Sequence, residues 1–128
     1  MSADDVSGLH VLIIDDEKDF ACTLASRLEL RGVQVVCAFN GEDGLARLRE
    51  DLPDVVLLDM RMPGLSGVEV LERIRLDLTD LPVIIVSGHC SQHDRESAED
   101  LGVLAFYPKP LQFRELLATL GTLRGKRG

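Results

Sequence analysis

Short, almost continuously apolar runs alternate along the whole chain with longer stretches in which apolar residues recur every three or four positions. The short runs are bounded by Gly, Pro or acidic residues and predict buried strands. The longer stretches predict amphipathic helices. The predicted strands are 10–14, 33–38, 55–58, 81–87 and 103–107. The predicted helices are 19–31, 41–52, 67–74, 91–102 and 113–120.

Local signals mark the ends of several of these helices. Gly32 follows the first helix as a natural C-terminal stop, and Pro53 ends the second. Asn40 precedes the second helix with an acid three residues later. Ser66 and Glu69 have the spacing of a capping box at the start of the third helix.

The helices differ in how strongly they should be packed. In the second helix, Leu45, Leu48 and Leu52 are expected to point inward. The fourth offers only Ala98 and Leu101 as clear inward residues, so we expect it to be the least firmly packed.

The strict alternation of strand and helix predicts an α/β fold. We expect a doubly wound, five-stranded parallel sheet, covered on both faces by helices and connected by right-handed crossovers. A chain of 128 residues suits a single domain. That domain should span 9–123, preceded by a polar lead-in over 1–8 and followed by a basic flexible tail over 124–128.

Composition narrows the function. The chain has a net charge of −8 and no basic cluster longer than 124–127, so it is a poor nucleic-acid binder by itself. No apolar run approaches the roughly 20 residues of a membrane span. The acidic N-terminus lacks the basic region of a signal peptide. These features predict a cytoplasmic protein without membrane contact.

The three cysteines, Cys22, Cys37 and Cys90, are odd in number and widely spaced. This pattern favours reduced, mostly buried thiols over a disulfide or a zinc site.

Polar side chains stand where four of the predicted strands end. Asp15 and Asp16 follow the first strand, Asp59 the third, Ser87 ends the fourth and Lys109 follows the fifth. In open parallel sheets the carboxyl ends of the strands form the ligand-binding edge. Three close carboxylates repel one another unless a cation neutralises them, and Mg²⁺ is the cation that prefers such oxygen ligands.

This constellation predicts chemistry on phosphate. With Mg²⁺ and Lys109 beside it, Asp59 stays ionised and can attack phosphorus as a nucleophile. The metal, the ammonium and the Ser87 hydroxyl would stabilise charge on the transferred oxygens. The product is an acyl phosphate, whose lability to water suits a signal.

Over nearly its whole length the chain resembles the receiver domain of two-component response regulators. The resemblance rests on Asp15-Asp16 after the first strand, Asp59 in DMRMPG, Ser87 in VSGH, and Lys109-Pro110. It implies a flavodoxin-like sheet with strand order 2-1-3-4-5. It also implies phosphoryl transfer to Asp59 from a phosphohistidine of a histidine kinase or phosphotransfer protein, without turnover of a substrate.

The resemblance assigns further roles. Mg²⁺ would be held by Asp16, Asp59 and the Met60 backbone carbonyl, with Asp15 acting largely through water. Lys109 would pair with the phosphoryl group, and its peptide bond to Pro110 would be cis.

By the same resemblance, Ser87 and Phe106 would move together and change the surface of the fourth helix, fifth strand and fifth helix. A downstream protein or output domain would bind that surface, and phosphorylation-dependent dimerisation through it stays open. Ser87 and Phe106 replace the commoner Thr and Tyr of the family, which bears on how tightly the two are coupled.

Arg61 and His89 lie two residues after Asp59 and Ser87, where they should flank the mouth of the pocket. We hypothesise that they tune how fast water reaches the aspartyl phosphate. Plainer interpretations stay open for single residues: a turn cap for Asp59, helix-start acids for Asp15 and Asp16, a solvated lysine for Lys109, a turn residue for Ser87, a core ring for Phe106, and either kinase docking or helix packing for Phe20.

Two alternative functions remain. One is a Mg²⁺-dependent phosphatase with an aspartyl nucleophile, which needs a second acid two residues after the nucleophile, where this chain has Arg61. The other is a protein-interaction module on the same fold that is never phosphorylated. The complete set of acids, Ser87 and Lys109 argues against it.

Overall fold

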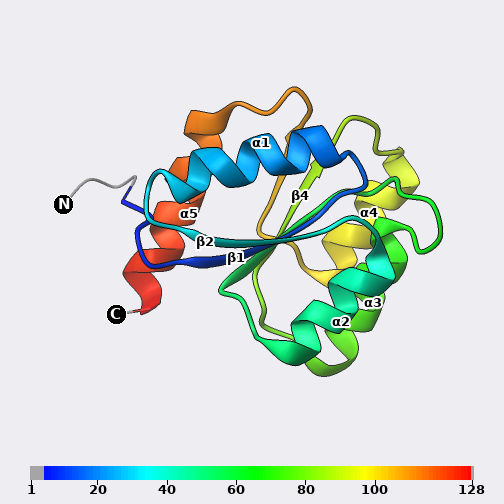
Figure 1. Cartoon of the computed structure of the whole chain (residues 1–128). Coiled ribbons are helices and arrows are strands. Elements are labelled where there is room, and N and C mark those ends of the chain that lie inside the picture. The colour runs from blue at the N-terminus through cyan, green and yellow to red at the C-terminus, as the bar shows by residue number, and fades with distance from the viewer. Residues whose placement is uncertain (1–4, 128) are drawn as a thin grey trace.

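The computed structural model describes residues 5–127, which form one sheet between two layers of helices (Figure 1). In chain order the elements are β1 (His10–Ile14), α1 (Lys18–Glu29), β2 (Gln34–Ala38), α2 (Gly41–Glu50), β3 (Val55–Leu58), α3 (Gly67–Asp77), β4 (Val83–Ser87), α4 (Gln92–Leu101), β5 (Ala105–Pro108) and α5 (Phe113–Arg127).

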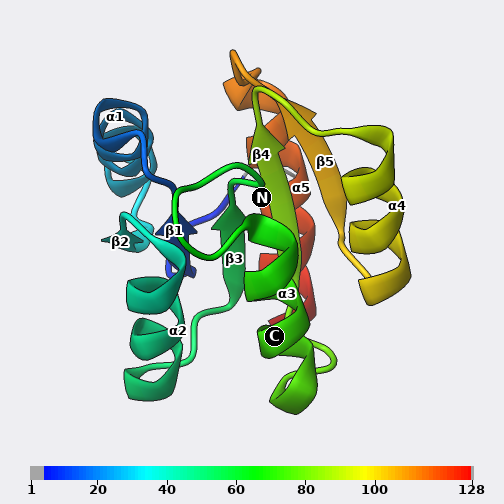
Figure 2. The same cartoon turned by 90° about the vertical axis from the view of Figure 1, so that its right-hand side faces the viewer.

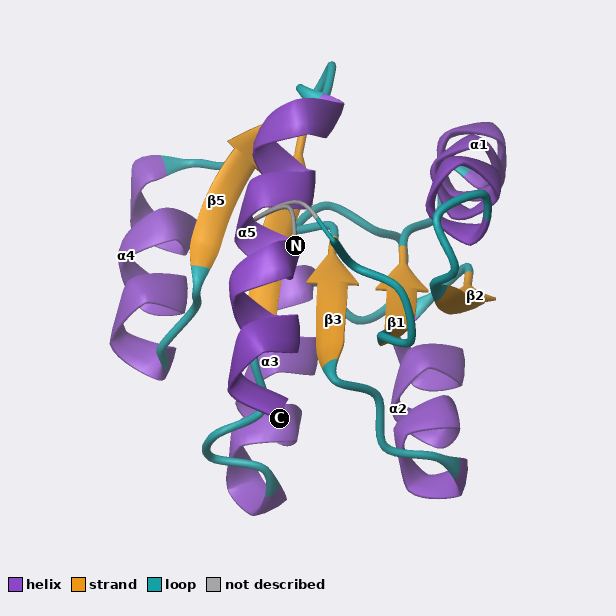
Figure 3. Cartoon of the chain, turned by 90° about the vertical axis from the view of Figure 1, so that its left-hand side faces the viewer, coloured by secondary structure: helices purple, strands orange, loops and turns teal. Residues whose placement is uncertain are grey.

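The sheet confirms the predicted topology. Its strands pair in parallel in the order β2-β1-β3-β4-β5. The arrowheads of β1, β3 and β5 point the same way in Figure 3. Every strand therefore delivers its carboxyl end to the same edge of the sheet, which positions the candidate site.

Side chains alternate between the two faces of the sheet, so the apolar core has two halves. On one face, Ile13, Leu57 and Ile84 pack with α1 and α5. On the other face, Ile14 and Leu58 pack with α2, α3 and α4. The helices lie accordingly on opposite sides of the sheet in Figures 1 and 2. Because β1, β3 and β4 are covered on both faces, their sequences are apolar except for His10 at the start of β1 and Ser87 at the end of β4.

Predicted caps are present at two helices. The Asn40 side chain accepts the backbone N–H of Asp43 at 2.8 Å, which caps α2. Ser66 and Glu69 form a capping box at α3, and its hydrogen bonds to Ser66 lower the pKa of Glu69. These bonds satisfy N–H groups that would otherwise lack partners in the first turn.

Several expectations need correction. The side chain of Leu52 is 57% exposed, not inward, because α2 ends at Glu50 and the chain is already extended at Asp51. Val6 is buried in the core, although it lies in the segment 1–8 predicted to be a polar lead-in. The last helix continues to Arg127, into the segment predicted to be a flexible tail.

The termini of the described chain meet at α5. Arg124 donates from Nε to the Ser7 carbonyl at 2.6 Å, and its Nη1 lies 3.8 Å from a carboxylate oxygen of Asp5. This contact joins the segment before β1 to the last helix. No helix within residues 5–127 is long and apolar enough to span a membrane.

The cysteines are free but less buried than expected. Cys22 is exposed, whereas Cys37 and Cys90 are partly buried. The Cys37 thiol lies 3.9 Å from the Ala21 carbonyl oxygen. Burial, with a smaller contribution from Cys22, raises the pKa of the Cys37 thiol to about 11.

This difference predicts an order of alkylation. The thiolate is the reactive form, and a thiol with a pKa of 11 is only about one part in a thousand thiolate at pH 8. We expect iodoacetamide at pH 8 to modify exposed Cys22 well before Cys37, and Cys37 to react faster as the pH rises toward 11. Peptide mapping by mass spectrometry after timed quenching measures both rates. Equal rates at pH 8 would contradict the burial of Cys37.

Candidate functional site

The ladder of β1, β2 and β3 extends one residue past the strands and fixes two of the predicted carboxylates. The backbone N–H of Asp15 donates to the Ala38 carbonyl at 3.0 Å, and that of Asp59 donates to the Ile14 carbonyl at 3.0 Å. Asp59 therefore sits beside the end of β1. Both residues are buried, at 2% exposed for Asp15 and 4% for Asp59.

Lys109 follows β5, the edge strand of the sheet opposite β2, and its side chain reaches these carboxylates from there. Its backbone N–H donates to the Ser87 carbonyl at 3.3 Å, and its peptide bond to Pro110 is cis, as predicted. The ammonium Nζ lies 2.8 Å from Asp15, 2.5 Å from Glu17 and 3.6 Å from Asp59. The side chain of Lys109 is only 11% exposed.

The charges in this cluster do not cancel. Asp15, Glu17 and Asp59 present carboxylate oxygens that all lie within 4.8 Å of one another, against the one ammonium of Lys109. Burial raises the pKa of Asp15, although hydrogen bonds from Lys109 and from the backbone of Glu17 oppose it. Burial also opposes charge on Lys109, but its hydrogen bonds to Asp15 and Glu17 raise its pKa overall. The cluster keeps an excess of negative charge.

That excess, carried by hard oxygen ligands, fits a divalent cation such as Mg²⁺. The predicted ligands are only partly brought together. Asp15 and Asp59 belong to the cluster, but its third carboxylate is that of Glu17, and Asp16 is partly buried outside it. The Met60 carbonyl accepts the backbone N–H of Gly67 at 2.9 Å, so only its second lone pair is left for a metal.

Sequence reasoning missed Glu17. It is the third acid of the run that begins at Asp15, but nothing in the sequence shows which member of such a run faces a lysine far along the chain. Phe20 was also missed as a contact of the site. The Lys109 ammonium lies 4.4 Å from the centre of the Phe20 ring, within the range of a cation–π contact.

The hydroxyl predicted to meet a phosphoryl group is occupied elsewhere. Ser87 is buried, and its Oγ donates to the His89 carbonyl at 3.0 Å. Phe106 is partly buried and packs on the face of the sheet that α2, α3 and α4 cover. Arg95 of α4 lies over the Phe106 ring at 4.3 Å from its centre. The ring is therefore held by a cation as well as by the core.

As predicted, α4 packs against the domain through few apolar side chains. Ala98 is the one buried side chain of this helix, and Leu101 is partly buried. Arg75 of α3 holds the C-terminal end of α4: it donates to the carbonyls of Leu101 at 2.8 Å and Gly102 at 2.6 Å. Polar contacts thus replace much of the apolar packing found at the other helices.

Arg61 and His89 are both exposed, two residues after Asp59 and Ser87 in the chain. The backbone N–H of Arg61 donates to an Asp59 carboxylate oxygen at 3.4 Å. That their side chains flank the mouth of the site, and that they affect the access of water, both stay predictions.

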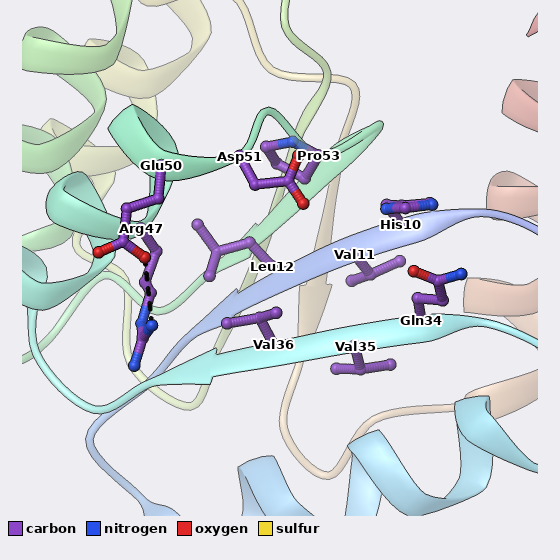
Figure 4. A pocket seen from close by; sticks show the side chains of 10 residues that line it. All are labelled: His10, Val11, Leu12, Gln34, Val35, Val36, Arg47, Glu50, Asp51 and Pro53. Atoms are coloured by element: carbon purple, nitrogen blue, oxygen red, sulfur yellow. Dashed lines mark hydrogen bonds and ion pairs between the residues drawn. The ribbon is translucent and has the colours of Figure 1, made fainter.

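Figure 4 shows a hollow away from this edge, where β1 and β2 begin. It lies beside α2 and contains His10, Gln34 and the ion pair between Arg47 and Glu50. None of the predicted site residues lines it.

Known proteins are similar to this chain in sequence and in fold. Residues 11–121 match the response regulator receiver domain family. The chain is 39% identical over 111 residues to the Bacillus subtilis protein named "Uncharacterized transcriptional regulatory protein YkoG", covering 87% of this chain and 49% of that protein. It is 35% identical over 123 residues to the transcriptional regulatory protein PrrA of Mycobacterium leprae, covering 96% of this chain and 53% of that protein.

Among solved structures, the receiver domain of the Francisella response regulator 1452 superimposes with a TM-score of 0.85 at 27% identity. The match covers 94% of this chain and all of that one, 100%. The fold and the acidic cluster define a class of α/β domain whose candidate site lies at the carboxyl ends of a parallel sheet. This chain belongs to the receiver domain family of two-component response regulators. It spans about half the length of the curated relatives it matches.

Gly67 lies against the backbone of the site and leaves no room for a side chain. A Cβ there would lie 2.5 Å from the Asp59 carbonyl oxygen and 2.5 Å from the Met60 Cα, both backbone atoms that cannot rotate away. We expect Gly67→Ala to destabilise the domain by about 1–3 kcal/mol through overpacking and to displace Asp59. Urea unfolding measures the first effect, and Mg²⁺ titration the second.

Gly88→Ala is the matched control, because its Cβ would meet only the Lys109 Cβ, at an ordinary 3.8 Å. It should stay within about 0.5 kcal/mol of the wild type. Equal stability of the two variants would show that the loop after β3 has room for a side chain.

Proposed function

We propose that Asp59 accepts a phosphoryl group from a phosphohistidine of a histidine kinase or phosphotransfer protein, with Mg²⁺ as cofactor. The observation that carries this proposal is the buried Asp59 carboxylate, held at a strand end beside Asp15 and 3.6 Å from the Lys109 ammonium. A carboxylate in this setting has an excess of negative neighbours, which a divalent cation offsets, and a positive group ready for phosphoryl oxygens.

In this reaction an Asp59 carboxylate oxygen attacks phosphorus, and the bond from phosphorus to the imidazole nitrogen of the donor breaks. The leaving imidazole takes the electron pair. Lys109 neutralises charge on the transferred oxygens. By resemblance to the family, Asp16 would join Asp59 and the free lone pair of the Met60 carbonyl in holding Mg²⁺, with Asp15 acting through water. The bound ion supplies charge neutralisation at the phosphoryl oxygens.

Phosphorylation then offers Ser87 a better partner. Its hydroxyl would leave the His89 carbonyl and donate to a charged phosphoryl oxygen, which forms a stronger hydrogen bond. The movement of Ser87 vacates space beside Phe106, and the ring turns inward, away from Arg95. Since α4 is held mainly by Arg75 and Arg95, this change alters the α4-β5-α5 surface.

A partner that recognises this surface completes the proposal. About half the length of the named transcriptional regulators lies outside the matched region, so an output domain or a downstream protein is the expected recipient. Direct binding of nucleic acid by this acidic domain is not part of the proposal, and neither is turnover of a substrate. A cytoplasmic setting, where the domain would meet its phosphohistidine donor, is part of the proposal.

The phosphatase alternative is not favoured, because the position two residues after Asp59 carries exposed Arg61, which is no general acid. The non-phosphorylated interaction module is not favoured either, because the carboxylates and Lys109 form an intact cluster.

Incubation with acetyl phosphate and Mg²⁺ tests the phosphoacceptor. The intact mass of the wild type should rise by one phosphoryl group, and that of Asp59→Asn should not, since the amide is not nucleophilic. Removal of Mg²⁺ by a chelator should also abolish the gain. Phosphorylation of Asp59→Asn at the wild-type rate would refute the assignment. Steady release of phosphate from unrelated esters would favour the phosphatase.

Arg61 and His89 supply a test of access to water. If their side chains cover the mouth of the site, Arg61→Ala and His89→Ala should shorten the half-life of the aspartyl phosphate. We expect a factor of about two to ten, equivalent to about 0.4–1.4 kcal/mol in activation free energy. Loss of radiolabelled phosphate from purified phosphoprotein measures it. Unchanged half-lives in both variants would end the hypothesis.

A further inference from the structure

The side chain of Glu17 takes an unusual path. Glu17 is the N-cap residue of α1, and side chains at this position ordinarily accept an N–H of the first helical turn. That of Glu17 makes no such bond. Its carboxylate instead accepts a hydrogen bond from Lys109, 92 residues further along the chain, at 2.5 Å. The backbone N–H of Glu17 meanwhile donates to Asp15 at 2.9 Å.

The close partners of the Lys109 ammonium therefore all come from the segment after β1. Glu17 and Asp15 lie at 2.5 and 2.8 Å, and the Phe20 ring covers the group at 4.4 Å. Asp59, the phosphoacceptor, is at 3.6 Å, beyond a normal hydrogen bond. Lys109 is therefore held away from Asp59, on which it would neutralise the phosphoryl group.

We propose that Glu17 is a positioning residue that keeps Lys109 off Asp59 until the phosphoryl group arrives. This inference rests on the assignment of Asp59 as phosphoacceptor. While Lys109 is held, the oxygens of Asp59 stay available to a divalent cation and to phosphorus. Without Glu17, the ammonium moves onto Asp59 and competes with the cation for the same oxygens.

The hold is weak enough to be reversed. The Glu17 side chain is 62% exposed, so water screens its attraction for Lys109. A phosphoryl group on Asp59 carries up to two negative charges next to the ammonium. Lys109 then passes from Glu17 to the phosphoryl oxygens, and Glu17 is left in solvent, where an unpaired carboxylate costs little.

The variant Glu17→Asp tests the position of the carboxylate at residue 17 separately from its charge. The variant keeps the negative charge but is one methylene too short to hold Lys109 at the same place, and Asp is itself a favoured N-cap, so the domain should fold. We expect the Kd for Mg²⁺ in the unphosphorylated protein to rise about two- to fivefold, the range of an exposed ion pair. The titration is followed by the backbone amide shifts of residues 59–67.

Asp19→Asn is the control. Asp19 is an exposed acid in the first turn of α1, and no hydrogen bond or ion pair of its side chain is present in the described part of the chain. The control removes a charge without touching Lys109, so its Kd should stay near that of the wild type. In a Lys109→Met background, Glu17→Asp should have no further effect.

The proposal is overturned if Glu17→Asp binds Mg²⁺ like the wild type, if Asp19→Asn weakens binding as much, or if the effect of Glu17→Asp persists without Lys109. Because the titration uses unphosphorylated protein, these outcomes are separate from a failure of Asp59 to accept phosphate, which the mass measurement reports.

Discussion

The ion-pair cluster around the Lys109 ammonium is the interaction on which the site depends. Parallel pairing brings Asp15 and Asp59 together at the ends of adjacent strands, where burial alone would disfavour two ionised carboxylates. Lys109 offsets part of that cost, but one ammonium cannot balance the three carboxylates of the cluster. The remaining negative charge makes the edge suited to a divalent cation.

The same edge is linked to the rest of the molecule through a weakly attached helix. α1 and α5 pack several large apolar side chains against the sheet, whereas α4 buries only Ala98, whose transfer from water contributes little. Its position depends on Arg75 at one end and on Arg95 over Phe106. A helix held by polar contacts can move when one contact changes, without disturbing the two halves of the core.

The fold could be predicted from the sequence because each helix and strand carries its own local signal. The capping box of Ser66 and Glu69 and the apolar run of β3 are examples. Sequence reasoning also brought Asp15, Asp59 and Lys109 together, since the topology alone puts strand ends side by side. Features that depend on residues far apart in the chain could not be predicted in this way. The contact of Glu17 with Lys109 leaves no periodic pattern in the sequence. Leu52 fits the helical spacing, but it follows the end of α2 and is exposed.

Magnitudes limit what Ser87 can do by itself. Its hydrogen bond to the His89 carbonyl joins neutral groups, for which the net contribution is about 0.5–1.5 kcal/mol, against about 1.5–3 kcal/mol for a bond to a charged group. The exchange thus favours the phosphorylated arrangement by roughly 1–1.5 kcal/mol, about a tenfold shift. Moving an equilibrium from 1:99 to 99:1 takes about 5.5 kcal/mol. In the proposed switch, the transfer of Lys109 onto the phosphoryl group and the preference of a partner for the altered α4-β5-α5 surface would supply the rest. Phosphorylation would then bias the surface, and binding of the partner would complete the change.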